Sequence, residues 1–338
     1  MKLRTFLGLL FSGRLGLLLR LSRDVEPVYR TAFLATAGSN GVLAALDGGP
    51  RSLGKLAAEL GLAPDSHEAL AAWLAVGVGV GVLKRRGDQY QLRGKVARAL
   101  AGGDQDAFVA MLQQTLGLHR QLIMEAPGRL QAGHPFTLAD QDGRLIARVS
   151  KLIEPFVDEA LDAVIPRSGS YALFDVGCGE GRYLRHACGR NPQLTALGLE
   201  LQDDVAAMCR DNVREWGLAD RVRVEVGDIR QRPARPEFDL ITLHSLIYYF
   251  PWQSRVELLT HLAGFLKPGG QLMITTSCQS DQPTLAVLNL WATTTAGCGR
   301  LPTAEEMTEQ LREAGFARCE RRAIIPGEHV VAFTARRG

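Results

Sequence analysis

Apolar residues recur at helical spacing through the first half of the chain, with turn-forming residues between the periods. This pattern predicts three successive helices over residues 27–47, 52–62 and 65–83. Ser52 is placed to cap the second helix, and Asp65 or Ser66 can cap the third. A hairpin is then predicted over residues 83–92. The order helix, turn, helix, hairpin is that of a winged helix.

Two roles are open for this winged-helix region. Lys84, Arg85 and Arg86 in the hairpin can contact DNA phosphates. The helix in the recognition position, residues 67–80, is almost wholly apolar and offers no Arg, Asn or Gln to base edges. It is suited to burial, so we expect a structural or dimerising role, with DNA binding as the alternative.

Helical periodicity continues after the hairpin, over residues 106–123 and 144–165. A loop is predicted between these two segments, over residues 126–143. We expect the two helices to connect the first domain to the second and to cover a site.

From Ser170 onward, short apolar runs alternate with amphipathic stretches, which predicts parallel strands joined by crossover helices. The predicted strands cover residues 171–177, 195–201, 222–229, 238–246 and 271–278, the last entered through a turn at 266–270. A helix over 300–316 and two strands joined by a turn at Pro326 and Gly327 complete the chain. The pattern predicts an α/β, Rossmann-like, doubly wound seven-stranded sheet with an antiparallel C-terminal hairpin, preceded by a mainly α-helical winged-helix domain.

Composition fits a globular protein of two domains, because 338 residues with 46% hydrophobic content can bury a substantial core. The net charge of +3 is too small to require a nucleic-acid or acidic partner. The six cysteines have no CxxC pairing and no His partners at zinc spacing. They are expected to be reduced, in a cytoplasmic protein.

The first 23 residues resemble a signal peptide at first sight, but Arg14 interrupts the apolar stretch and no small-x-small cleavage site follows. No apolar run reaches the roughly 20 residues that span a bilayer. The segment has an apolar helical face and carries no acid before Asp24. Two interpretations are open: a helix docked on this protein or on a partner subunit, and a helix on a membrane surface.

Three glycines, Gly177, Gly179 and Gly181, directly follow the first strand of the second half. Glycines there let the backbone turn sharply and approach a ligand closely, with a helix N-terminus facing it. On its own this pattern also fits a structural turn.

Acidic residues lie at the ends of three consecutive predicted strands, and they strengthen the ligand hypothesis. They are Asp175, Glu200 and Asp228. Ligands of such sheets bind at the carboxyl ends of the strands, so these acids are expected at one sheet edge. Glu200 can accept both hydroxyls of a ribose, and Asp228 followed by Ile229 suits the amine and apolar face of an adenine.

The motifs DVGCGEG, LGLE, VGDI, FDLI and LKPGGQLMI, read together, resemble those of class I S-adenosylmethionine-dependent methyltransferases. The resemblance covers residues 170–338, and with the winged-helix region the whole chain is similar to two-domain O-methyltransferases of secondary metabolism. It implies S-adenosylmethionine as the cofactor and a homodimer formed through the N-terminal helices. The implied cofactor-binding residues are Asp175, Gly177, Gly179, Gly181, Glu200, Leu201, Asp228, Ile229, His244 and Ser245.

The O-methyltransferases that the chain resembles use a His after the fourth strand as base, and Tyr248 occupies that position, with Tyr249 beside it. The expected histidine is therefore missing. His244 and Tyr248 are the candidate catalytic residues, although His244 also fits a cofactor-lining role. Tyr248, Tyr249, His119 and His134 are the candidate substrate contacts. No His and carboxylate groups occur at metal-ligand spacing, so no metal is predicted.

The resulting prediction is methyl transfer from S-adenosylmethionine to a small organic acceptor, on oxygen, carbon or nitrogen. Its alternatives are a relative that holds the cofactor without transferring a methyl group, and a DNA-binding regulator with a metabolite-sensing domain. Four divisions are predicted. Residues 1–25 form an amphipathic basic helix and residues 26–100 a winged-helix dimerisation domain. Residues 101–168 form a helical region that covers the substrate, and residues 169–338 form the methyltransferase domain. The expected partners are a small molecule and a second copy, with no nucleic acid, and residues 1–23 allow peripheral membrane contact.

Overall fold

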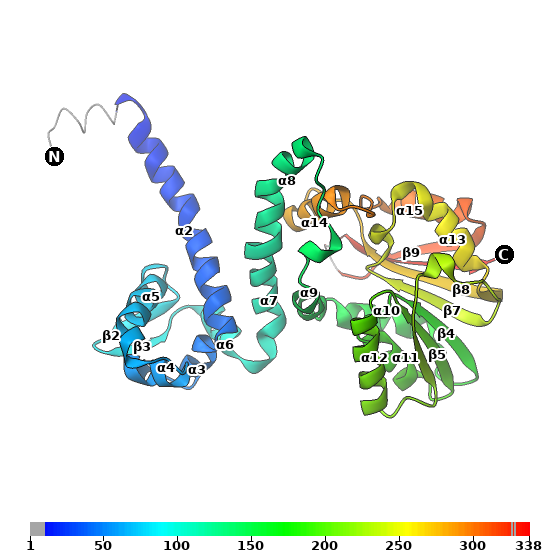
Figure 1. Ribbon diagram of the computed structural model, residues 1–338, viewed down its shortest axis with the longest axis horizontal. Coiled ribbons are helices and arrows are strands. Elements are labelled where there is room, and N and C mark those ends of the chain that lie inside the picture. Colours follow the sequence, from blue (N-terminus) through cyan, green and yellow to red (C-terminus); the bar gives the residue numbers. More distant parts are fainter. Residues whose placement is uncertain (1–10, 326, 328) are drawn as a thin grey trace. The chain divides into compact units, whose positions relative to one another are not determined.

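The computed structural model describes residues 11–325, 327 and 329–338 (Figure 1). It forms two compact units, and each is described by itself. The first unit consists of residues up to Gln121 together with Gln141–Leu152, and the second consists of Leu122–Asp140 together with Ile153–Gly338. The predicted region 101–168 is therefore divided between the two units. The first ten positions of the predicted N-terminal helix lie outside the described residues.

The first unit is mainly α-helical. Its helices are α2 (Arg14–Ser39), α3 (Val42–Asp47), α4 (Leu53–Glu59), α5 (His67–Gly79), α6 (Lys95–Ala101), α7 (Asp106–Gln114) and α9 (Gly143–Ser150). Strands β1 (Arg51–Ser52), β2 (Leu83–Arg86) and β3 (Gln89–Leu92) form a small sheet in the order β1-β3-β2. The predicted hairpin is thus confirmed, and the second and third predicted helices are present.

The apolar helix α5 is a core element, because Leu70 and Leu74 are buried and Trp73 stacks on Phe33 of α2 at 4.5 Å between ring centroids. A Cβ atom on Gly77 would lie 2.2 Å from Phe33 Cζ, so a larger residue there would have to displace the Phe33 ring. Burial of α5 agrees with the structural role expected from its composition.

Helix ends in the first unit differ from the prediction in several places. The helix expected over 27–47 is divided, because α2 ends at Ser39 and α3 begins at Val42, and the helix expected over 65–83 ends at Gly79. The break expected near residue 25 is absent, because α2 runs from Arg14 through Pro27 to Ser39. Residues around Pro27 are exposed, so water can bond the backbone carbonyl that a proline leaves unpaired. At the start of α4 the Ser52 hydroxyl accepts a hydrogen bond from Lys55 N at 3.4 Å, which confirms Ser52 as the predicted N-cap. Ser66 makes no side-chain cap bond, because a 3₁₀ turn leads directly into α5.

The second unit is built on one seven-stranded sheet in the order β6-β5-β4-β7-β8-β10-β9. Its strands are β4 (Tyr171–Val176), β5 (Leu194–Glu200), β6 (Val222–Val226), β7 (Phe238–His244), β8 (Leu266–Ser277), β9 (Phe316–Ala323) and β10 (Val330–Arg337). The pairs from β6 to β8 are parallel, whereas β10 pairs antiparallel with both β8 and β9. The predicted sheet with its antiparallel hairpin is confirmed.

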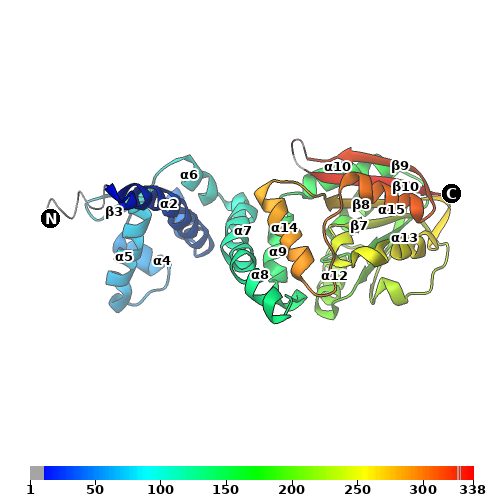
Figure 2. The ribbon, with the colours of Figure 1, turned by 90° about the horizontal axis from the view of Figure 1, so that it is seen from above.

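Helices cover both faces of this sheet (Figures 1 and 2). They are α10 (Glu154–Val164), α11 (Arg182–Arg190), α12 (Asp203–Glu215), α13 (Arg255–Ala263) and α15 (Ala304–Glu313), with α8 (Arg120–Ala132) and α14 (Pro283–Thr294) alongside. Apolar residues of α10, α11 and α12 share one buried cluster, and those of α13 and α15 share the other. None of the helices in the described ranges combines the length and apolarity needed to cross a bilayer.

Three local predictions for the second half of the chain were wrong. The helix expected over 144–165 is two helices, α9 and α10, because Pro155 opens a new first turn at α10. Strand β6 ends at Val226, and Asp228 instead caps a 3₁₀ turn. The segment 266–270 is not a turn before the strand but a bulge inside β8: Phe238 pairs with Leu266 and Leu240 with Gln271.

Candidate functional site

A glycine loop connects β4 to α11 at the carboxyl end of the sheet. Gly177, Gly179 and Gly181 all have positive φ angles, of 71°, 54° and 86°, which favour glycine. Gly177 N and Cys178 N donate to the Leu199 carbonyl at 2.7 and 3.1 Å, which fixes the loop on the end of β5.

The three glycines have different surroundings. A Cβ atom on Gly177 would lie 2.8 Å from Leu246 Cδ2, and one on Gly181 would lie 2.6 Å from Cys209 Sγ. At Gly179 nothing lies within 4 Å. Gly177 and Gly181 are therefore favoured by their φ angles and by the crowding of neighbouring side chains, whereas Gly179 faces open space in which a ligand can approach the backbone.

Glu200, the last residue of β5, binds to this loop through its carboxylate. Glu200 Oε2 accepts from Gly179 N at 3.0 Å, and Oε1 accepts from Leu201 N at 2.9 Å and Gln202 N at 3.2 Å. The Leu201 side chain is 56% exposed. The predicted residues Gly179, Glu200 and Leu201 thus lie together, with one carboxylate holding two loops at the sheet edge.

Asp228 and Ile229 follow β6, the edge strand next to β5. Asp228 Oδ1 accepts from Arg230 N at 3.0 Å, and the Arg230 guanidinium pairs with Oδ2 at 2.6 Å. The hydrogen bond from Arg230 lowers the pKa of Asp228, so its carboxylate is ionised and can accept. Ile229 is buried in the apolar cluster under the sheet. Arg230 was not predicted, although its position two residues after the acid is visible in the sequence.

Asp175 is a buried carboxyl near the end of β4. Oδ1 accepts from the Thr242 hydroxyl at 2.7 Å, while Oδ2 is buried and has no hydrogen-bond partner within the described parts of the chain. Burial raises the pKa of Asp175 to about 7; the Thr242 hydrogen bond opposes this shift and the charge of Glu200 adds to it. An unpaired buried oxygen of this kind suits a cationic or hydrogen-bond-donating ligand.

His244 ends β7, where the strand register pairs it with Thr275 of β8. The Nδ1 atom lies 2.8 Å from Thr275 Oγ1, and the ring packs at 4.3 Å from the Tyr183 ring. Nε2 is buried, with no hydrogen-bond partner among the residues described. Burial lowers the pKa of His244 to about 3, so the imidazole is neutral at neutral pH. Ser245 follows with a φ of 52°, a strained angle for a residue with a side chain.

Tyr248 and Tyr249 form an aromatic cluster with Trp291 of α14. The two tyrosine rings stack at 5.3 Å, and Trp291 meets them edge-on at 6.0 and 5.2 Å. Tyr248 bonds the Ser245 side chain, and burial raises the pKa of its hydroxyl, which therefore stays protonated. Trp291 Nε1 is buried and has no hydrogen-bond partner within the described residues. Trp291 could not be predicted as a site residue, because a Trp in an apolar helix looks like a core residue.

A buried arginine, Arg255 of α13, holds the segment behind this aromatic cluster. Its guanidinium donates to the carbonyls of Phe250, Gly299 and Arg300 at 3.1, 2.8 and 2.8 Å. Gly299 N in turn donates to the Tyr248 carbonyl at 3.0 Å. These bonds fix the chain after β7 against the loop that follows α14.

The two remaining candidate substrate contacts are placed differently. His119 lies in the first unit, in a π-turn over Thr115–His119, and burial lowers its pKa. His134 lies in the second unit after α8 and has an exposed side chain. Among the described residues, no group of three or more His, Cys, Asp or Glu side chains is placed to hold a metal ion.

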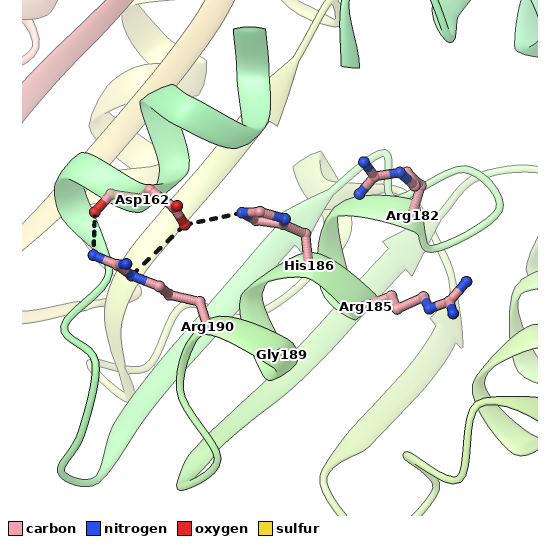
Figure 3. Close-up of a pocket in the computed structure, with 6 residues that line it drawn as sticks. All are labelled: Asp162, Arg182, Arg185, His186, Gly189 and Arg190. Carbon is pink, nitrogen blue, oxygen red and sulfur yellow. Dashed lines mark hydrogen bonds and ion pairs between the residues drawn. The ribbon is translucent and has the colours of Figure 1, made fainter. Parts of the chain in front are cut away.

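A hollow of about 550 Å³ lies between α10 and α11 and is lined by Asp162, Arg182, Arg185, His186, Gly189 and Arg190 (Figure 3). Three of its basic side chains have carboxylate partners: His186 Nε2 lies 2.9 Å from Asp162 Oδ1, Arg190 Nε lies 3.6 Å from the same oxygen, and Arg182 pairs with Glu154 at 3.1 Å and with Asp158. The fourth, Arg185, packs over the Trp216 ring at 5.0 Å. None of the predicted cofactor-binding residues lines this hollow. The ion pairs connect two helices rather than offering a site for an anion.

Comparisons with known proteins bear on the same region. Residues 173–270 match a family described as a methyltransferase domain. The chain is 29% identical over 179 residues to the trans-aconitate 2-methyltransferase of Deinococcus radiodurans, covering 52% of this chain and 64% of that protein. It is also 29% identical over 301 residues to the demethylspheroidene O-methyltransferase of Cereibacter sphaeroides, covering 82% of this chain and 76% of that protein.

Solved structures share the fold over nearly the whole chain. An O-methyltransferase family protein from Burkholderia thailandensis superposes with a TM-score of 0.74 at 20% identity, covering 95% of this chain and 98% of that one. Human N-acetylserotonin methyltransferase in complex with S-adenosylmethionine superposes with a TM-score of 0.73 at 16% identity, covering 95% of this chain and 97% of that one. Residues 173–270 therefore match a methyltransferase domain, and the chain has the fold of solved O-methyltransferases.

Proposed function

We propose that this protein transfers the methyl group of S-adenosylmethionine to a small organic acceptor of secondary metabolism, on oxygen, carbon or nitrogen. The observation that carries the proposal is the glycine loop held by Glu200, with Gly179 facing open space at the carboxyl end of the sheet. The chain covers only 64% of its trans-aconitate relative, so that protein's acceptor does not transfer directly to this one.

The residues at this sheet edge fit the cofactor. Glu200 would accept the ribose hydroxyls, Asp228 the adenine amine, and the unpaired Oδ2 atom of Asp175 the ammonium group of the methionine portion. The bound cofactor supplies a methyl group already activated by its sulfonium. The chain's own residues then have to align the acceptor and receive its proton where it carries one.

The aromatic cluster of Tyr248, Tyr249 and Trp291 is the proposed acceptor site. Aromatic faces suit an apolar or aromatic acceptor, and the unpaired indole N–H of Trp291 calls for an oxygen or other hydrogen-bond acceptor on that molecule. Tyr248 occupies the position of the usual base, but its buried hydroxyl stays protonated, so it donates a hydrogen bond instead of accepting a proton. Tyr248 therefore orients the acceptor.

His244 is the proposed proton acceptor. If Nδ1–H donates to Thr275, the lone pair of Nε2 is left without a partner in the described structure and can receive a proton. We expect His244→Ala to slow methyl transfer by about a hundredfold, the lower end for general-base catalysis, because a pKa near 3 makes a weak base. Tyr248→Phe removes one hydrogen bond and should cost less than about tenfold.

Single-turnover rates of the two variants provide the measurement. Tyr171→Phe is the control, because Tyr171 is the first residue of β4, at the opposite end of that strand from the glycine loop. Equal small losses in His244→Ala and Tyr248→Phe would remove His244 from the role of base. A flat rate across all variants would mean that the acceptor needs no proton acceptor.

Cofactor affinity should depend on the ionisation of Asp175. Burial raises the pKa of Asp175 in the folded state from 3.8 to about 7. The unfolded chain therefore loses this proton first, and the free energy of unfolding falls as the pH rises from 3.8 to about 7. A cationic ammonium group prefers the ionised carboxylate, so affinity for S-adenosylhomocysteine should rise with pH up to about 7, by at most about tenfold per pH unit. Calorimetric titration at several pH values measures this, and Asp175→Asn should flatten the profile. An unchanged slope in Asp175→Asn would assign the pH dependence to another group.

The competing hypotheses differ in turnover. Methyl-labelled S-adenosylmethionine incubated with a panel of hydroxyl, carboxyl and amine acceptors should yield S-adenosylhomocysteine and a labelled product. Tight cofactor binding without transfer to any acceptor would support the non-methylating relative. Salt-sensitive DNA binding would support the regulator. Dimer formation through the first unit, without a nucleic-acid partner, is part of the proposal.

A further inference from the structure

Two buried cysteines bring their thiols into contact at the glycine loop. Cys178 belongs to the loop itself and is 5% exposed, and Cys209 of α12 is fully buried. Their sulfur atoms lie 3.9 Å apart. The proposed methyl transfer uses neither sulfur, so this pair of thiols has no role in the chemistry assigned above.

The backbone on both sides leaves room for these sulfur atoms. A Cβ atom on Gly181 would lie 2.6 Å from Cys209 Sγ, and one on Gly198 of β5 would lie 2.8 Å from Cys178 Sγ. Helix α12 is also tied to the loop one turn after Cys209, where Asn212 Nδ2 donates to a backbone carbonyl of the loop at 3.0 Å. Packing and this hydrogen bond therefore hold the two thiols next to each other.

The two thiols can form a disulfide without an opening of the fold. The sulfur atoms of a disulfide lie about 2 Å apart, so the thiols have to close roughly half of their present separation. Cys209 lies on the buried face of α12 with Ala206 and Val213, whereas Cys178 is flanked by two glycines, which adopt many backbone conformations. The loop rather than the helix is therefore expected to move.

Movement of Cys178 would disturb the candidate cofactor site. Cys178 N donates to the Leu199 carbonyl at 3.1 Å, and the next amide, Gly179 N, donates to Glu200 Oε2 at 3.0 Å. Both bonds hold the loop in the shape that leaves open space in front of Gly179. A disulfide that draws Cys178 toward α12 would weaken these bonds and change that space.

We propose that Cys178 and Cys209 are a site of oxidation, at which a hydroperoxide converts the two thiols into a disulfide that weakens cofactor binding by the glycine loop. The effect on the cofactor rests on the proposed function, whereas formation of the disulfide does not.

The reaction with hydrogen peroxide proceeds in two steps. The Cys178 sulfur attacks one peroxide oxygen, the O–O bond breaks, and a sulfenic acid and one water form. The Cys209 sulfur then attacks the sulfenic sulfur, the S–O bond breaks, and a second water leaves. The thiols lose two electrons and two protons in total, and each proton ends on one of the two water molecules.

The rate of oxidation should depend on pH. The hydrogen bond with Cys209 and burial raise the pKa of the Cys178 thiol, so little of the reactive thiolate is present at neutral pH. Oxidation should therefore be slow at neutral pH and faster at higher pH.

Peptide mapping of the full chain after treatment with hydrogen peroxide tests the site. A peptide containing Cys178 linked to a peptide containing Cys209 should appear, and dithiothreitol should remove it. Calorimetric titration of the same sample should show that affinity for S-adenosylhomocysteine falls by at least about tenfold, the effect of losing one hydrogen bond, and dithiothreitol should restore it.

Two variants separate this disulfide from general oxidative damage. Cys209→Ala lacks one partner, so peroxide should leave its cofactor affinity unchanged. Cys319→Ser alters a half-buried cysteine of β9 and should respond to peroxide like the unmodified chain. Absence of the linked peptide from the unmodified chain, or an equal loss of affinity in Cys209→Ala, would overturn the proposal.

Failure of the proposed function gives a different result. If the reduced protein does not bind S-adenosylhomocysteine, the proposed function is refuted, and the linked peptide still reports the disulfide. A linked peptide with unchanged affinity in a protein that binds S-adenosylhomocysteine would overturn the proposed effect on the cofactor.

Discussion

Replacing Glu200 by alanine should weaken binding of S-adenosylhomocysteine by about 2 to 3 kcal/mol, roughly 30- to 150-fold. The loss has two sources in the structure. The ribose hydroxyls lose their proposed acceptor, and the amides of Gly179, Leu201 and Gln202 lose the carboxylate that orders the two loops. Isothermal titration calorimetry measures the affinity directly.

Glu215→Ala provides the control for Glu200→Ala, since Glu215 is an exposed acid at the end of α12. Its removal should leave cofactor affinity unchanged. The same affinity in Glu200→Ala as in the control would refute the ribose role of Glu200.

Gly179→Val should reduce cofactor affinity by at least about a hundredfold, because the new methyl groups would fill the open space in front of the loop and the φ of 54° disfavours a β-branched residue. The backbone strain alone should lower unfolding stability by about 1 to 3 kcal/mol. Thermal unfolding and cofactor titration of the same preparation separate the two effects.

Gly269→Val is the matched control for the backbone strain. Gly269 has a φ of 74°, and a Cβ atom there would also meet nothing within 4 Å, but it lies in the bulge of β8. This variant should lose similar stability and keep its cofactor affinity. If both variants lose affinity alike, the effect comes from strain, and the open space at Gly179 is not the cofactor site.

The architecture of the second unit was predictable because each strand is a short apolar run and each crossover helix has its own period. The β4 and β5 strands and their following loops are local patterns, so the position of Gly177 to Gly181 and of Glu200 at the carboxyl end of the sheet could be predicted from sequence alone. Helix continuity was less predictable. Pro27 is tolerated inside α2 where the helix is exposed, whereas Pro155 begins a new helix at the point where the chain passes into the second unit.

The candidate site was only partly visible in the sequence. Thr275 reaches His244 through the pairing of β7 with β8, and Tyr183 reaches it from α11, so neither contact leaves a local signal. Trp291 joins Tyr248 and Tyr249 from a helix more than forty residues later in the chain. Long-range packing of this kind depends on the assembled sheet, and periodicity cannot report it.

The most direct test of the account is a crystal structure of the protein with S-adenosylhomocysteine and a methyl acceptor. The account predicts the ribose hydroxyls on Glu200, the adenine amine on Asp228, the ammonium group on Asp175, and the acceptor between the sulfur and the aromatic cluster of Tyr248, Tyr249 and Trp291. A cofactor bound away from the loop of Gly177 to Gly181, or an acceptor outside the aromatic cluster, would contradict it.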